Sequence, residues 1–271
     1  MTRTLVPLAA ALAAAPFLVA TASAQGLTIH SANMTFATGA LSPTTPTAPE
    51  LDLRATAGGP DHGYRHGWFY RLAGDPQEYA FAGLGPSTAS VTAAQDHADR
   101  DFADVDNRGL LRAALDCDTY STGATTGFAT SRLTVRNVSA VAQTIDLFAY
   151  VDLDVGGTFN NDIAIGAPML HAVRDWTGVQ IEVRAVDADR SDVLAHPLLL
   201  NLLTDANVDD LGNHAPPFAG DYTSAFQWSA VVLTPGEQRS FTLVLAVDET
   251  ATDAAVVEAY GRGSTAGAEI H

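Results

Sequence analysis

The stretch TIDLFAYVDLDVGGTFNND (residues 144–162) decides the fold. From residue 145 to residue 155 its odd positions are aliphatic, and its even positions are acidic or aromatic. Alternation of this length predicts a β-strand with one buried face. Gly156 and Gly157 then end the strand, and the Asn/Asp-rich residues that follow predict a loop. We therefore expect a long central strand that delivers acidic side chains to a polar loop.

Similar alternating segments recur along the chain, separated by Gly, Pro, Asn and Asp. We expect residues 128–136 to pair with residues 145–155, and residues 226–233 to form a hairpin with residues 241–247. A single strand is expected over residues 27–36. At least ten short strands with such turns predict an all-β fold, a large antiparallel two-sheet β-sandwich with two short helices.

The two helices have local signals of their own. Residues 197–204 form a short apolar run with a proline in its first turn. Residues 250–260 begin with the capping pattern Thr250-x-x-Asp253 and end before a glycine. The first helix, which is apolar, is expected to pack and not to face solvent.

The N-terminus predicts export. Arg3 precedes an apolar run over residues 5–20, and Ala22-Ser-Ala24 provides a small-x-small cleavage site. This arrangement is typical of a secretory signal peptide over residues 1–24, with an uncleaved anchor as the alternative. The mature protein is then extracellular or periplasmic, with no membrane insertion after cleavage.

The mature chain divides by composition. Residues 25–50 hold an N-terminal strand and a Thr/Pro-rich loop, because proline removes hydrogen-bond donors from a strand. Residues 51–262 are expected to form the sandwich, with residues 27–36 paired into it, and residues 263–271 a frayed tail. The single cysteine, Cys117, excludes an intramolecular disulfide and is expected to be a small buried strand residue.

The charge of the chain limits its partners. The 31 acidic residues outnumber 14 basic ones, all of them arginine, which gives a net charge of −17. Such a chain lacks the basic surface that nucleic acids and anionic membranes require. The same charge is compatible with divalent cations and with simple solubility.

The stretch PDHGYRHGWFYRL (residues 60–72) carries a run of rings. If it is a strand, one face bears His62, Tyr64, His66, Trp68 and Tyr70. In one interpretation these side chains are a ligand-binding platform on which sugar rings stack. In the other, Trp68 and Tyr70 belong to the core and face the partner sheet.

The same stretch offers the residues for an enzymatic alternative. Asp61, His62 and His66 would be the catalytic residues of a hydrolase. The two histidines stand about 13 Å apart along a strand, so they share one zinc ion only if the strand is kinked. The chain contains neither a Gly-x-Ser-x-Gly elbow nor a His-Glu-x-x-His motif, so the sequence favours a non-catalytic protein.

The loop after the central strand is the candidate metal site. Asp152 and Asp154 leave the strand on one face, and Asn160 and Asp162 follow in the loop. Carboxylate and amide oxygens are the ligands that Ca²⁺ prefers. Ordinary capping of a turn by Asn and Asp is the alternative.

Three segments together resemble an uncharacterised group of exported bacterial β-proteins. They are DHGYRHGWFYRLAGDPQEYAF (61–81), LTVRNVSAVAQTIDLFAYVDLDVGGT (133–158) and GDYTSAFQWSAVVLTPGEQRSF (220–241). The resemblance implies export and a β-sandwich but no reaction. Some members carry a C-terminal sorting segment with a short apolar span, which the residues after Gly261 do not match.

Three functions follow as hypotheses. The first is an exported, non-catalytic module that binds a glycan or another envelope component, with calcium bracing the loop at residues 152–162. The second is a secreted hydrolase that acts on extracellular polysaccharide. The third is a structural or assembly subunit.

Overall fold

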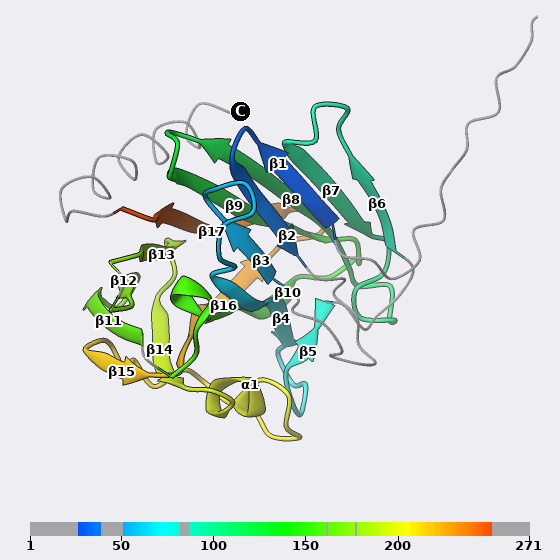
Figure 1. Ribbon diagram of the computed structural model, residues 1–271. Coiled ribbons are helices and arrows are strands. Elements are labelled where there is room, and N and C mark those ends of the chain that lie inside the picture. The colour runs from blue at the N-terminus through cyan, green and yellow to red at the C-terminus, as the bar shows by residue number, and fades with distance from the viewer. Residues whose placement is uncertain (1–26, 39–50, 82–86, 161, 177, 251–271) are drawn as a thin grey trace, which may run out of the picture.

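The computed structural model describes residues 27–38, 51–81, 87–160, 162–176 and 178–250 (Figure 1). Every strand pair in it is antiparallel, and the strands form three sheets. Sheet A contains β1 (Leu27–Ser31), β2 (Met34–Thr38) and β3 (Leu51–Arg54), in that order. The predicted signal peptide and the 263–271 tail lie outside the described residues.

Sheets B and C are the two layers of the sandwich. Sheet B has the order β14–β16–β10–β4–β5, and sheet C has the order β15–β11–β12–β13–β17–β9–β8–β7–β6. The strands of sheet B are β4 (Gly63–Leu72), β5 (Tyr79–Ala80), β10 (Gln143–Leu153), β14 (Arg190–Ala195) and β16 (Tyr222–Leu233). The strands of sheet C are β6 (Ser87–Val91), β7 (His97–Phe102), β8 (Leu111–Ser121), β9 (Thr126–Asn137), β11 (Asp162–Ala167), β12 (Leu170–Arg174), β13 (Gln180–Val186), β15 (Phe218–Gly220) and β17 (Gln238–Asp248). The predicted antiparallel all-β sandwich is therefore confirmed.

The central strand β10 lies in the middle of sheet B, between β16 and β4. Its odd positions, from Ile145 to Val155, are all buried between the layers. Two even positions, Phe148 and Tyr150, are also fully buried, in a second apolar cluster that includes Leu199 from the helix. The strand therefore has two buried faces where the alternation predicts one, because the helix covers part of its outer face.

Two predicted strand pairings are wrong. Residues 128–136 lie in β9 of sheet C, whereas residues 145–153 lie in β10 of sheet B, which ends two residues before the predicted strand end at Val155. Likewise β16 belongs to sheet B and β17 to sheet C, so these strands form no hairpin. In both places the chain turns and crosses to the opposite layer. Instead of pairing with each other across the turn, β10 pairs with β16 and β9 pairs with β17.

Asn137 connects the two crossings. Its buried side-chain amide donates hydrogen bonds to the carbonyl oxygens of Val141 and Leu233, at 2.7 and 2.9 Å. Its backbone amide donates to the carbonyl of Glu237, and its own carbonyl accepts from Gly236. One buried asparagine thus satisfies backbone groups in both turns, which strand alternation cannot reveal.

The N-terminal segment differs from the expected single strand. The chain turns at residues 32–33, so β1 and β2 form a hairpin, and β2 pairs with β3. This hairpin, blue in Figure 1, packs over β7 and β8 through Ile29, Met34 and Phe36. Cys117 is buried beneath it, as expected.

The first predicted helix is present as α1 (Leu198–Leu202). Of the second, only Thr250 lies within the described residues. Among the described residues, no helix has both the length and the apolar character that crossing a bilayer requires.

Candidate functional site

An acid-lined hollow lies at the end of β10, on the outer side of sheet B. It has a volume of about 220 Å³, and its walls are Tyr64, Asp152, Asp154, Phe159, His196 and Asp221. The residues come from β4, the end of β10, the loop after it, the residue before Pro197, and the turn between β15 and β16. Segments distant in sequence meet here because sheet B places β16, β10 and β4 side by side.

Asp152 forms the floor of the hollow and is almost completely buried. Its Oδ2 accepts a hydrogen bond from the Tyr150 hydroxyl at 3.1 Å and lies 2.8 Å from Nδ1 of His196. Burial raises the pKa of the Asp152 carboxyl to about 6, against the opposing effects of His196 and Tyr150. The Asp152 carboxyl is therefore able to take up or release a proton near pH 6 while in contact with an imidazole.

Three carboxylates converge in the hollow. Oxygens of Asp152, Asp154 and Asp221 all lie within 4.8 Å of one another. Burial, and then the charge of Asp221, raise the pKa of the Asp154 carboxyl. Anionic groups this close repel one another, so a proton or a cation stabilises the group.

Asp162 adds a fourth carboxyl group nearby. Its side chain is fully buried, and neither of its carboxyl oxygens has a hydrogen-bond partner among the described residues. Burial raises its pKa to about 8, and the charges of Asp154 and Asp221 contribute, whereas the backbone amide of Tyr222 opposes them from outside hydrogen-bonding geometry. A buried carboxylate without a partner is costly unless it is neutralised.

The structure brings together some of the predicted metal ligands and not others. Asp152 and Asp154 share the hollow, whereas Asp162 is buried at the start of β11 beside it. Asn160 is exposed and has a positive φ of 64°, a conformation that asparagine tolerates in turns. Asn160 therefore lies in a turn and does not line the hollow.

Sequence reasoning missed Asp221 and His196. The antiparallel ladder between β10 and β16 pairs Asp152 with Thr223. Continuing this register by two residues in each strand brings Asp154 opposite Asp221. That signal requires the correct partner for β10, and the alternation predicted a different one. No sequence signal pointed to His196.

The predicted aromatic platform is for the most part interior. His62, His66, Trp68 and Tyr70 are buried, and only Tyr64 is exposed, at 40%. Trp68 stacks on Trp228 with ring centroids 5.6 Å apart and donates a hydrogen bond to Ser131. The alternative in which Trp68 and Tyr70 face the partner sheet is the one observed, because both point between the layers.

Tyr64 is the exception and belongs to the hollow. Its ring meets that of His196 edge to face, with centroids 5.8 Å apart. Phe159, which is 72% exposed, stands on the same rim. Two rings beside three carboxylates are the side chains that sugar sites commonly present.

The residues of the predicted hydrolase site have structural contacts. One carboxylate oxygen of Asp61 accepts the backbone amides of Leu53 and Gly63. His62 accepts the amide of Gly156 at Nδ1, and its Nε2 lies 3.2 Å from Glu249. His66 is buried and has no hydrogen bond to any described residue, and burial lowers its pKa to about 4. These three side chains hold the fold together and do not line the hollow.

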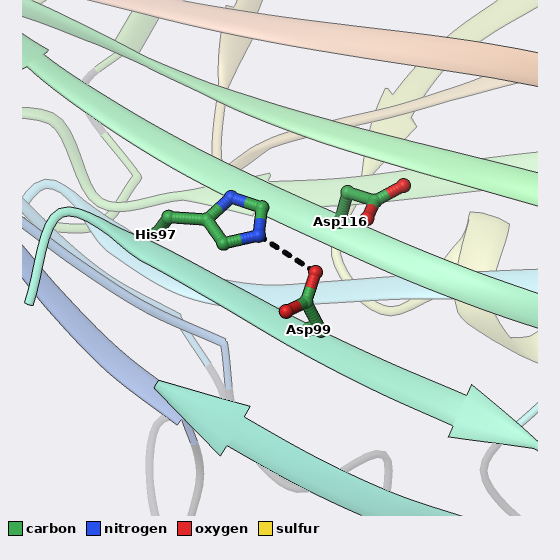
Figure 2. A group of neighbouring side chains, drawn as sticks. All are labelled: His97, Asp99 and Asp116. Carbon is green, nitrogen blue, oxygen red and sulfur yellow. Dashed lines mark hydrogen bonds and ion pairs between the residues drawn. The ribbon is translucent and has the colours of Figure 1, made fainter. Parts of the chain in front are cut away.

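A second group of acids lies on the outer face of sheet C. His97, Asp99 and Asp116 also bring ligand atoms within 4.8 Å of one another (Figure 2). His97 bridges Asp99 and Asp118 at 2.6 and 2.7 Å, and Arg132 lies 3.3 Å from Asp116. The cations of this group already compensate its carboxylates, so it is the weaker candidate for a metal.

The chain is thus a two-layer antiparallel β-sandwich with an acid-lined hollow on one outer side. No family model matches its sequence, and no curated protein does. Solved structures match its fold: a bacterial glucoamylase complexed with acarbose (TM-score 0.59, 10% identity) covers 88% of this chain. A galactose mutarotase related enzyme from Lactobacillus acidophilus (TM-score 0.53, 8% identity) covers 84%.

The lengths of these neighbours differ. The match covers 34% of the glucoamylase, so this chain spans about a third of that protein, but it covers 99% of the mutarotase-related enzyme. At such identities the likeness shows the fold alone. The fold is one that carbohydrate-active enzymes also have.

Proposed function

We propose that the protein is an exported, non-catalytic module that binds a glycan in the hollow beside Asp152. The observation that carries the proposal is the composition of its walls: two exposed rings, Tyr64 and Phe159, over three carboxylates and an imidazole. Ring faces offer area for stacking on a sugar, and carboxylates accept hydrogen bonds from its hydroxyl groups. At about 220 Å³ the hollow suits one sugar ring, since sites for larger ligands start at about 300 Å³.

A calcium ion is the second part of the proposal. Asp152, Asp154 and Asp221 would supply its protein ligands, and water or sugar hydroxyls would complete the six to eight oxygens that calcium takes. The buried carboxyl of Asp162, which has no hydrogen-bond partner among the described residues, supports a cation here independently of the cluster. Calcium would then neutralise the group and present open coordination positions to a sugar.

The test is binding to an array of neutral glycans, followed by calorimetry with the best ligand. We expect Tyr64→Ala and Phe159→Ala each to weaken binding about fivefold, since a ring contact is worth about 1 kcal/mol. Trp176→Ala is the matched control, because Trp176 is 80% exposed but does not line the hollow. Equal affinity in all four proteins would refute the site, and affinity unchanged by chelator would remove calcium from it.

The second candidate function is a hydrolase. Its catalytic pair would be Asp152 and His196, in place of the residues over 61–66 that the sequence suggested. A carboxyl whose pKa is raised to about 6 and that contacts an imidazole is a suitable acid or base. The assay is release of reducing sugar from the polysaccharide whose fragment binds. Activity that Asp152→Asn abolishes, while sugar affinity stays within a few-fold, would favour the hydrolase over the binding module.

A further inference from the structure

The outer face of sheet C carries two arginines side by side. Arg112 on β8 and Arg136 on β9 are directly opposed in the strand ladder, and both side chains are exposed. Opposed residues on one sheet face have Cβ atoms about 5 Å apart, and like charges at that distance repel. Both arginine side chains point away from the core, because their neighbours along the two strands, Leu111, Ala113 and Val135, are buried and side chains alternate between the faces of a sheet.

This pair is unusual in a chain with 31 acidic residues and 14 basic ones. Within the described residues, neither Arg112 nor Arg136 has an ion pair or a side-chain hydrogen bond. By contrast, Arg132 lies on the same face of β9, four residues before Arg136, and forms an ion pair with Asp116. Asp101 lies in the same hollow but forms no ion pair with either arginine among the described residues, and two guanidinium groups outnumber its one carboxylate. The protein therefore keeps a local positive charge on a negative surface.

The two arginines line a hollow of about 380 Å³. Ala114 and Thr134, the next opposed pair on this face, leave room above the sheet. Gln238, opposite Arg136 on β17, and Asp101 on β7 complete the polar walls. The hollow therefore offers two guanidinium groups, a hydroxyl and an amide, together with one carboxylate acceptor.

We infer that this hollow binds a carboxylate-bearing saccharide, such as a uronic acid unit of a polysaccharide. The sugar carboxylate would lie on the guanidinium groups of Arg112 and Arg136, which match its planar geometry. Asp101 would accept hydrogen bonds from sugar hydroxyls, whereas it would repel a bare inorganic anion. The inference does not rest on the hollow beside Asp152, which lies on the outer side of the opposite layer.

The experiment is calorimetric titration with a galacturonic acid trisaccharide and with its methyl ester. The ester keeps the rings and hydroxyls but removes the charge. We expect the acid to bind, the ester to bind at least tenfold more weakly, and the affinity for the acid to fall with added salt. Inorganic sulfate serves as the bare anion and should bind more weakly than the trisaccharide.

Variants complete the test. Arg112→Gln and Arg136→Gln should each lower the affinity for the acid at least tenfold, and neither should lower the melting temperature, because each relieves a like-charge contact. Arg239→Gln is the matched control: Arg239 is exposed on β17, pairs with Glu237 and does not line the hollow. Tyr64→Ala should bind the acid as the unmodified protein does, whatever it does to neutral sugars.

Several results would overturn the inference. The first is no binding of the acid trisaccharide, and the second is equal affinity for the acid and its methyl ester. The third is a loss of affinity for the acid in Arg239→Gln as large as in Arg112→Gln and Arg136→Gln. Sulfate that binds as tightly as the trisaccharide would show an anion site with no preference for a sugar.

Discussion

The two groups of acids differ in what surrounds them, although their ligand atoms are equally close. In both groups the oxygens and nitrogens lie within 4.8 Å of one another. The group on sheet C (Figure 2) is half-exposed, and His97 and Arg132 compensate it. The group beside β10 has one imidazole, His196, for three carboxylates; Asp152 is nearly fully buried, and the buried Asp162 beside it has no hydrogen-bond partner among the described residues. The comparison teaches that a cluster becomes a candidate cation site through burial and an excess of carboxylates, not through proximity alone.

The largest expected effect is stabilisation by calcium. At a free concentration one hundred times the dissociation constant, calcium should raise the free energy of unfolding by about 2.7 kcal/mol. Asp221→Asn should abolish the rise in melting temperature, whereas Asp99→Asn should leave it intact, and scanning calorimetry with and without chelator measures both. If Asp99→Asn abolished the rise in melting temperature and Asp221→Asn did not, the group on sheet C would be the calcium site.

The next effect is the pH dependence of stability without calcium. The pKa of Asp152 is raised to about 6, so the folded state binds more protons than the unfolded state between about pH 4 and pH 6. Stability should therefore fall as pH rises through this range, by about 3 kcal/mol for Asp152, and Asp162 should extend the fall towards pH 8.

Buried His66 acts in the opposite direction. Its pKa is lowered to about 4, so the unfolded state binds the extra proton and stability rises with pH from about 4 to 6.5. Urea unfolding of Asp152→Asn and His66→Gln separates the two contributions. Asp152→Asn should remove the fall between pH 4 and 6, and an unchanged fall in that variant would contradict the assignment.

The smallest effect is expected in the exposed group. Burial lowers the pKa of His97, but its hydrogen bonds to Asp118 and Asp99 outweigh this and raise it. The stabilisation is fully present below about pH 6.5 and is lost as pH rises through the raised pKa. Because these side chains are partly exposed, His97→Gln should cost less than about 1 kcal/mol at pH 6. A cost above about 2 kcal/mol, measured by urea unfolding, would show that the group is as strongly coupled as the one beside β10.

Strand alternation predicted the layers better than it predicted their connections. Residues 145–155 are a buried central strand because aliphatic side chains at every second position must leave water together. The same pattern cannot distinguish a hairpin from a crossing between layers, because both join two alternating strands by a short turn. The hydrogen bonds of Asn137 to both turns accompany the crossings, and only the folded structure shows them.

The candidate site was predicted in part for the same reason. Asp152 and Asp154 were visible because they follow the central strand in the chain. Asp221 was hidden because its neighbours in space depend on which strand pairs with β10. The rings of residues 62–70 were visible as a pattern, but only the packing of sheet B on sheet C shows that Tyr64 alone meets solvent.

The order of residues by itself determined that this chain is a strongly acidic antiparallel sandwich built around one strand, since periodicity and composition are local properties. Tertiary structure decided which acids stand together, which rings are covered and where two arginines face each other. These outcomes depend on strand partners far apart in the chain, whose choice is governed by packing between the layers.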